Sequence, residues 1–366
     1  MATDKSPAGP DQSDSVQFID ADAVRSFVGS VFAACGLSED DAGTCADGLV
    51  EADLRGVWSH GVARVPMYVE RLVNGVAKAA PDIRVERVAP AAALVDGDDG
   101  LGLVVAPRAM DEAITIAQEA GVGLAGVRNS GHFGMAAVYA KQAVAADCLG
   151  FVHTNASAAL PPWGGARALL GTNPFAFSAP TGDGAPFLID MAMSNVARGK
   201  LKFAAQRGEA IPEGLALDKD GQPTTDGAAA FEGVVLPFGG VKGAALSWMN
   251  DVLGGVFTGA AYGGDVANPF TGLDRPQNVG HVMIAMRADL FMPLADFEER
   301  MTDLAQRAKG LPKAEGFESI LAPGEPEELK AAHNRARGIP LTADVRAALQ
   351  DVGVATGVDC LFGETV

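Results

Sequence analysis

The chain is poor in cysteine and in positive charge. Its 366 residues include four cysteines, and 28 Lys and Arg stand against 46 Asp and Glu, for a net charge of -18. No two cysteines have the CxxC spacing of a zinc knuckle, and four scattered cysteines are typical of reduced core residues in a cytoplasmic protein. An acidic surface repels phosphate backbones, so we expect no nucleic-acid partner.

A long hydrophobic run is also missing. The longest weakly charged stretch, residues 243–264, is rich in glycine and is interrupted by Asn250 and Asp251, which predicts a buried helix rather than a membrane span. The first 15 residues are polar, lack the apolar region of a secretory signal, and are expected to form a disordered tail. These features together predict a soluble cytoplasmic protein with no membrane partner.

The composition is otherwise globular, with 48% hydrophobic residues, and the length suggests about two domains. Helices are expected in 21–54, where Ser38 can cap a helix start, and from Ser59 to Leu72. From residue 83 onward, short strands alternate with helices, which predicts an α/β domain with a covered sheet. The expected elements are helix 106–120, strand 123–128, helix 136–146, strand 149–154, strands 175–178, 187–190 and 281–286, and helices 242–258, 295–309 and 326–337.

Residues 121–126 spell GxGxxG, the fingerprint of a dinucleotide-binding loop, and Asp147 lies at a suitable distance after it. In that fingerprint the glycines follow a strand and open a helix, whose N-terminus holds the phosphates. Here a helix is expected before the glycines and a strand after them. The motif is therefore interpreted as a turn between a helix and a strand.

His60 and Arg64 form the first candidate for chemistry. Ser59, His60 and Gly61 stand at an expected helix start, and positions i and i+4 of a helix share one face. A histidine can transfer a proton near neutral pH, and an arginine can hold a carboxylate with two parallel bonds. The pair suits a 2-hydroxy or 2-oxo acid, although a capping Ser, a packed His and a solvated Arg would give the same pattern.

Other candidates are single motifs at strand ends or helix starts. Asn129 and His132 follow a strand, where α/β sheets place ligands, and the Gly171–Pro174 turn offers free N–H groups. Asp190 ends a strand and suits orienting a histidine, holding a ribose or capping a helix, while Lys242 at a glycine-rich helix start suits an anion. A metal site of His60, His132 and His153 is disfavoured because carboxylates at metal-ligand spacing are missing.

Seven segments, taken in order, resemble the malate/L-lactate dehydrogenase family of the non-Rossmann type, which also contains sulfolactate, ureidoglycolate and diketogulonate dehydrogenases or reductases. The resemblance covers nearly the whole chain after the tail. It rests on ADLRGVWSHGVARVPMY (52–68), GVGLAGVRNSGHFGMAAVYA (121–140), WGGARALLGTNPFAFSAPT (163–181), FLIDMAMSNVARGK (187–200), IPEGLALDKDGQPTTD (211–226), GGVKGAALSWMNDVLGGVFTGA (239–260) and PGE (323–325).

The resemblance implies an NAD(P)-dependent oxidoreductase and a homodimer, with a non-Rossmann cofactor domain at 81–309 and a helical substrate domain at 16–80 plus 310–366. It implies that His60 exchanges a proton with the substrate oxygen and Arg64 binds the substrate carboxylate. The acidic chain favours NAD over NADP. Substrate contacts are implied for Ser59, Arg64, Asn129, Thr172 and Asn173, catalytic roles for His60, Arg64, His132 and Asp190, and cofactor contacts for His132, Gly171, Leu188, Ile189, Asp190, Met191, Ala192, Lys242, Gly324 and Glu325.

Two positions depart from the family pattern. Val241 stands where members often have an aromatic residue, and Tyr68 stands where some have a second basic residue, so both are expected to influence the choice of substrate. The alternatives are a cyclic imino-acid reductase acting on Δ1-piperideine-2-carboxylate with the same His and Arg, a non-catalytic metabolite-binding protein, and a metal-dependent hydrolase.

Overall fold

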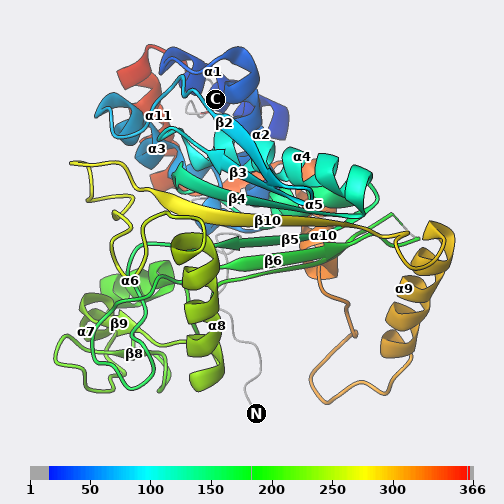
Figure 1. The fold of residues 1–366 in the computed structure, drawn as a ribbon. Coiled ribbons are helices and arrows are strands. Elements are labelled where there is room, and N and C mark those ends of the chain that lie inside the picture. The colour runs from blue at the N-terminus through cyan, green and yellow to red at the C-terminus, as the bar shows by residue number, and fades with distance from the viewer. Residues whose placement is uncertain (1–15, 183, 361, 363–366) are drawn as a thin grey trace.

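A computed structural model describes residues 16–182, 184–360 and 362; the predicted tail, residues 1–15, lies outside them. A seven-stranded mixed sheet forms the centre of the molecule, with helices on both faces (Figure 1). In sheet order, the strands are β2 (Arg84–Ala89), β3 (Ala92–Asp96), β4 (Val122–Ser130), β10 (Val279–Arg287), β5 (Cys148–Thr154), β6 (Phe175–Ala179) and β7 (Phe187–Met191).

Strand β10 lies between β4 and β5 and runs antiparallel to both, with Val282 opposite Gly126 on one side and His153 on the other. The strands expected at 123–128 and 149–154, with a helix between them in the chain, are present as β4 and β5 and run parallel to each other, but a strand from much later in the chain lies between them. The two adjacent parallel strands are β3 and β4, with α4 (Gly102–Ala120) as the crossover helix. Local alternation of helix and strand does not reveal which strands pair.

The glycines at 121 and 123 serve the contact between α4 and β4. Gly121 ends α4 with a φ of 87°, a conformation that glycine adopts without strain. The helix passes so close to the strand that a Cβ on Gly123 would lie 1.9 Å from the Ala113 carbonyl oxygen. A helix precedes these glycines and a strand follows them, which confirms the interpretation of GxGxxG as a turn.

Both faces of the sheet are covered by elements rich in small residues. Helices α4 and α5 (Ala137–Val144) cover one face through a buried cluster that is mostly alanine and valine. The other face meets α8 (Val241–Asp251) and the π-helical turn Val252–Val256 that continues it, in place of the single helix expected over 242–258. A Cβ on Gly280 of β10 would lie 1.6 Å from the Gly254 carbonyl oxygen, so this contact also requires glycine.

Helices from the early and the late parts of the described chain pack together in a helical layer above the sheet (Figure 1). Ser38 caps α2 by accepting the Asp41 N–H at 3.2 Å, as predicted. One apolar cluster joins residues 19–104 to residues 331–362, and the division into a helical domain (16–80 plus 310–366) and a cofactor domain (81–309) stays a prediction. The elements of this layer are β1 (Gln17–Ile19), α1 (Ala21–Ala34), α2 (Glu39–Leu54), α3 (Val65–Val73), α10 (Glu325–Arg337), β11 (Ile339–Leu341) and α11 (Ala343–Thr356).

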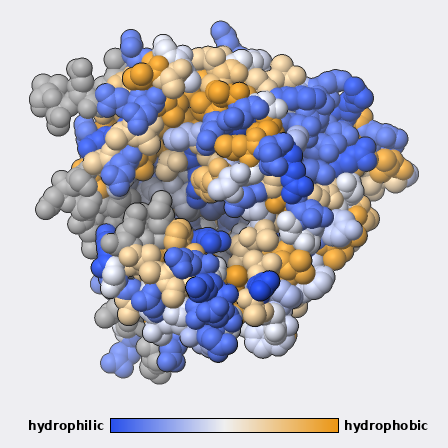
Figure 2. Space-filling model, turned by 90° about the vertical axis from the view of Figure 1, so that its left-hand side faces the viewer, coloured by the Kyte–Doolittle hydropathy of each residue, from blue (hydrophilic) through white to orange (hydrophobic). Residues whose placement is uncertain are grey.

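A smaller group of elements follows β7 and has its own apolar cluster around Leu160, Leu170 and Met193. It consists of α6 (Arg198–Arg207), β8 (Ala216–Leu217), α7 (Gly227–Glu232) and β9 (Val234–Val235), while α9 (Leu294–Lys309) follows β10. The face that carries α3 and α6 is hollowed near its middle (Figure 2). Among the described helices, none is long and apolar enough to cross a membrane.

Candidate active site

His60 and Arg64 do not lie on one helix as expected. Two short 3-10 turns, Trp58–His60 and Val62–Arg64, carry them, and α3 begins only at Val65. The break is at Gly61, where a Cβ would lie 2.1 Å from an Asp53 carboxylate oxygen. The buried Asp53 carboxylate accepts the Val62 N–H at 2.7 Å and so fixes the second turn. A contact from the preceding helix α2 thus overrides the local helical pattern.

The two turns nevertheless bring the predicted pair together. The Ser59 hydroxyl lies 2.8 Å from His60 Nδ1, and Arg64 Nε donates to the Ser59 carbonyl oxygen at 2.5 Å. The Arg64 guanidinium lies over the Phe270 ring, 5.0 Å from its centroid, and has no carboxylate partner among the described residues. Burial, together with the Arg64 cation, lowers the pKa of His60 to about 4, so the ring is neutral at pH 7.

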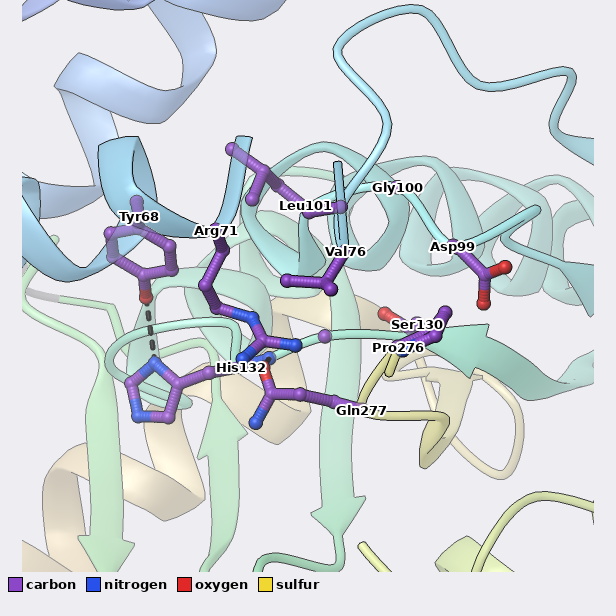
Figure 3. A pocket seen from close by; sticks show the side chains of 12 residues that line it. Tyr68, Arg71, Val76, Asp99, Gly100, Leu101, Ser130, His132, Pro276 and Gln277 are labelled. Carbon is purple, nitrogen blue, oxygen red and sulfur yellow. Dashed lines mark hydrogen bonds between the residues drawn. The ribbon is translucent and has the colours of Figure 1, made fainter. Parts of the chain in front are cut away.

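His132 lies just beyond the end of β4 and joins this pair. Its ring stacks on His60, with centroids 5.7 Å apart and an interplanar angle of 12°. Nδ1 lies 2.7 Å from the Tyr68 hydroxyl (Figure 3), and the backbone N–H of His132 donates to Gln277 at 3.0 Å. Burial, together with the neighbouring cations of Arg64 and Arg71, holds its pKa well below the ordinary value. The site therefore holds two neutral imidazoles beside an unpaired guanidinium.

A cavity of about 10 Å³, room for about one water molecule, adjoins His132. Arg71 lines it and is only 2% exposed, and its guanidinium donates to the carbonyl oxygens of Pro269, Gly272 and Arg275. Figure 3 shows Arg71 reaching between Tyr68 and Gln277 toward the loop at Pro276. Arg71 thus ties α3 to the 269–277 loop, which carries the Phe270 ring beneath Arg64 and the Gln277 partner of His132.

Two of the expected substrate contacts are engaged elsewhere. The Asn173 side chain has no exposed surface: its oxygen accepts the Ala156 N–H at 2.9 Å and its nitrogen donates to Ser247. In this structure Asn173 links α8 to the loop at Ala156, and its contact with substrate stays a prediction. The Asn129 side-chain nitrogen donates to Asp96 at 2.9 Å, away from His132. Ser59 and Thr172 keep accessible surface.

The expected cofactor residues around β7 and the Pro323–Glu325 turn do lie together. The Leu188 N–H donates to the Pro323 carbonyl oxygen at 3.1 Å, and Gly324 packs so tightly that a Cβ there would lie 2.9 Å from Leu188 Cβ. Asp190 accepts the Ala137 N–H at the start of α5 at 2.7 Å, which is a helix-capping contact. Asp190 as a residue is exposed, but many protein atoms surround its carboxylate group. This desolvation raises the pKa of Asp190 to about 6.

The remaining cofactor candidates divide between the sheet and α8. Gly171 is buried, and its carbonyl oxygen accepts the Ser247 hydroxyl of α8 at 3.0 Å. Lys242 is exposed in the first turn of α8, after Gly239 and Gly240. Ile189, Met191 and Ala192 keep accessible surface on and after β7, whereas Glu325 pairs with Lys309. Main-chain contacts between 193–195 and 236–238 link the end of β7 to the start of α8.

Sequence reasoning did not find three residues of this site: Asp53, Arg71 and Gln277. Tyr68 was expected to influence the substrate, but it is 1% exposed and its hydroxyl meets His132 instead. The only available signal was spacing, since Tyr68 and Arg71 follow Arg64 at one and two helical turns. Among the described residues, no group of three His, Cys, Asp or Glu side chains is arranged to hold a metal ion.

Comparison with known proteins identifies the family. A model described as malate/L-lactate dehydrogenase matches residues 19–350. The L-sulfolactate dehydrogenase of Methanocaldococcus jannaschii is 42% identical over 80% of this chain and 84% of its own length. The malate dehydrogenase of Pyrococcus horikoshii is 39% identical over 93% of this chain and 96% of its own. The chain belongs to the malate/L-lactate dehydrogenase family, as its motifs predicted.

Solved structures agree with this assignment. Malate dehydrogenase from Pyrococcus horikoshii OT3 superposes with a TM-score of 0.88 at 36% identity, covering 95% of this chain and 97% of that chain. The Δ1-piperideine-2-carboxylate reductase of Pseudomonas syringae superposes with a TM-score of 0.79 at 28% identity, covering 92% of this chain and 99% of that chain. The non-Rossmann α/β class is thereby confirmed. Curated relatives include dehydrogenases named for NAD(+) and for NADP(+). The chain is accordingly an oxidoreductase of the NAD(P)-dependent dehydrogenase class.

Proposed function

We propose that this protein interconverts a small 2-oxo acid and its 2-hydroxy acid, of malate or lactate type. The observation that carries the proposal is the grouping of Arg64, which has no described carboxylate partner, with the stacked imidazoles of His60 and His132. Arg64 binds the substrate carboxylate and so fixes the position of C2. His60 gives a proton to the substrate oxygen on reduction and takes it back on oxidation.

The residues around β7 fit an NAD(P) cofactor, with NAD favoured by the acidic composition. The fit rests on the close junction of Leu188 with Gly324 and on the accessible side chain of Asp190 at the end of β7. When bound, the nicotinamide supplies the hydride for reduction and accepts it in oxidation. The residues that would hold it are His132, Gly171, Leu188, Ile189, Asp190, Met191, Ala192, Lys242, Gly324 and Glu325.

The second candidate function is reduction of a cyclic imino acid. Two observations favour it: the structural likeness to a Δ1-piperideine-2-carboxylate reductase, and the neutral phenol of Tyr68 one helical turn beyond Arg64. The imine carbon would take the place of the keto carbon, while Arg64 would still hold the carboxylate.

The test is a substrate panel followed through the nicotinamide absorbance, with NADH and then NADPH. The panel contains oxaloacetate, pyruvate, 2-oxoglutarate, 3-sulfopyruvate and Δ1-piperideine-2-carboxylate. Oxidation of the cofactor by a 2-oxo acid supports the proposed reaction and identifies both substrate and cofactor. Turnover of the imine alone favours the second candidate. If no compound is reduced and neither NADH nor NADPH binds, both candidate functions are contradicted.

We further propose that the protein works as a homodimer in the cytoplasm, with α8 at the subunit contact. Exposed apolar side chains repeat at helical spacing along α8 and the π-turn, from Val241 through Trp248, Met249 and Val252 to Val256. Such a continuous stripe is typical of a protein interface.

The dimer proposal is tested by measuring mass in solution by light scattering. Trp248→Glu should shift the protein toward the monomer, because a charge would enter the apolar contact. Val354→Glu is the matched control, since Val354 is 80% exposed on α11. A wild-type monomer, or equal dissociation in both variants, contradicts the assignment of α8.

A further inference from the structure

The hydrogen bonds at His132 determine which ring nitrogen carries the proton. Nδ1 lies 2.7 Å from the Tyr68 hydroxyl and 3.3 Å from the backbone nitrogen of Gly134. A backbone N–H can only donate. The Gly134 N–H faces both the Tyr68 oxygen and Nδ1, and because it has hydrogen-bond geometry toward Nδ1, we take Nδ1 as an acceptor that carries no hydrogen. The Tyr68 hydroxyl, which can donate or accept, must then donate as well. Two donors thus converge on one nitrogen.

The surroundings keep the ring neutral. Burial and the cations of Arg64 and Arg71 all oppose a positive charge on His132. A neutral imidazole carries one hydrogen, and since Nδ1 has none, the hydrogen is on Nε2. Among the described residues, Nε2 has no hydrogen-bond partner, and it lies on the side of the ring away from the phenol (Figure 3). An N–H donor is therefore left for a ligand between His132 and its neighbours.

Tyr68 is well placed to enforce this state. It is 1% exposed on α3, its ring meets Phe32 edge-on at 6.3 Å, and burial raises the pKa of the phenol, so the phenol stays protonated at every working pH. The residue belongs to the apolar cluster of the helical layer, whereas His132 follows a strand of the sheet. A side chain from the helical layer thus contacts the ring nitrogen of a residue that follows a strand of the sheet.

We propose that Tyr68 is a positioning residue that locks His132 in the tautomer with hydrogen on Nε2. In this state His132 serves as a fixed hydrogen-bond donor to the substrate oxygen, and the transferred proton belongs to His60 alone. The assignment of this donor to substrate rests on the proposed function. The tautomer itself does not, and it can be measured in the absence of any substrate.

The direct test is ¹⁵N NMR of protein labelled at histidine. The chain has five histidines, and His132→Gln identifies the signals of His132 by their loss. In the wild type we expect an unprotonated Nδ1 and a protonated Nε2. Tyr68→Phe should shift these signals toward a mixture of tautomers, because only the longer Gly134 contact remains. A wild-type ring protonated on Nδ1, or a Tyr68→Phe spectrum unchanged at His132, overturns the proposal.

Tyr139→Phe is the matched control. Tyr139 is also a buried phenol, and it donates to the Phe133 carbonyl oxygen, next to His132, without touching the imidazole. Loss of this bond should leave the His132 signals in place. An equal effect of both variants would mean that loop stability, and not the phenol on Nδ1, fixes the tautomer, which would also overturn the proposal.

Kinetics separate this proposal from the proposed function. With an active substrate, Tyr68→Phe should lower kcat about tenfold, the equivalent of one hydrogen bond, and change KM much less, because the donor acts on an oxygen that gains charge during the reaction. A raised KM with unchanged kcat would contradict a role for the donor in turnover. If no substrate is turned over, the proposed function fails while the NMR result still decides the role of Tyr68.

Discussion

The chain places two histidines in an accessible site and two others in the adjoining core. His60 and His132 keep accessible surface, and each has a ring nitrogen with no protein partner among the described residues. His281 is fully buried, with Thr154 at 2.8 Å from one ring nitrogen and Ser130 at 2.9 Å from the other. His153 meets Asn250 at 2.8 Å.

The difference lies in what surrounds each ring. Stacking occurs in both places, since His281 lies 4.7 Å from Phe133 with an interplanar angle of 6°. Burial lowers the pKa of His281 to about 3, so the core ring is neutral as well. Neutrality and stacking therefore do not mark a functional histidine; an unoccupied nitrogen beside an unpaired arginine does.

The largest effect is expected from His60→Ala. Loss of the proton donor should lower kcat about a thousandfold, while NADH binding, measured by fluorescence, is retained. His153→Gln is the control, because it changes a core histidine that has a protein partner, and its kcat should stay within about threefold of wild type. Comparable losses of kcat in both variants would contradict the distinction between the site histidines, His60 and His132, and the core histidines.

Arg64→Lys should lower kcat/KM about a hundredfold. The ammonium group cannot hold a carboxylate through two parallel bonds, so substrate capture suffers more than turnover. Arg108→Lys provides the comparison, since Arg108 is exposed and pairs with Asp41 at 2.6 Å on the surface. If steady-state kinetics give an unaltered kcat/KM for Arg64→Lys, Arg64 is not the carboxylate anchor.

The pH dependence should differ between the two directions of the reaction. Reduction needs a protonated His60, and the pKa of the free enzyme's His60 is about 4, so kcat/KM for reduction should fall about tenfold per pH unit above that value. Oxidation needs the neutral ring and should be level from about pH 5 upward. A level profile for reduction between pH 6 and 8 would assign the proton to another group.

The smallest effect concerns Asp53, whose pKa burial raises to about 7, against the opposing Val62 N–H bond. A raised folded-state pKa means that stability is present at low pH and is lost as the pH rises from about 4 to about 7. Denaturant unfolding should therefore favour Asp53→Asn over wild type by about 1–2 kcal/mol more at pH 8 than at pH 5. Asp220→Asn, an exposed change, should show no such trend. If the free energies of unfolding of Asp53→Asn and wild type change in parallel with pH, burial does not raise the pKa of Asp53.

Much of the fold could be predicted from local sequence patterns. The cap at Ser38, the helix before Gly121 and the strand after it follow from side-chain chemistry and backbone conformation within a few residues. The position of β10 between β4 and β5 could not be predicted, because strand order depends on segments far apart in the chain. The two turns around Gly61 were missed for a related reason, as the Asp53 carboxylate that imposes them lies on α2.

Motifs carry residue type and order, and these were enough to predict the family, the α/β class and the grouping of His60, Arg64 and His132. Which polar groups are free could be seen only in the folded chain. Asn173 is satisfied by Ala156 and Ser247, whereas Arg64, within the described part of the chain, contacts the Phe270 ring and a backbone oxygen and pairs with no carboxylate. Hydrogen-bond partners come from wherever the chain returns in space, so the availability of a side chain for chemistry is a property of the folded molecule.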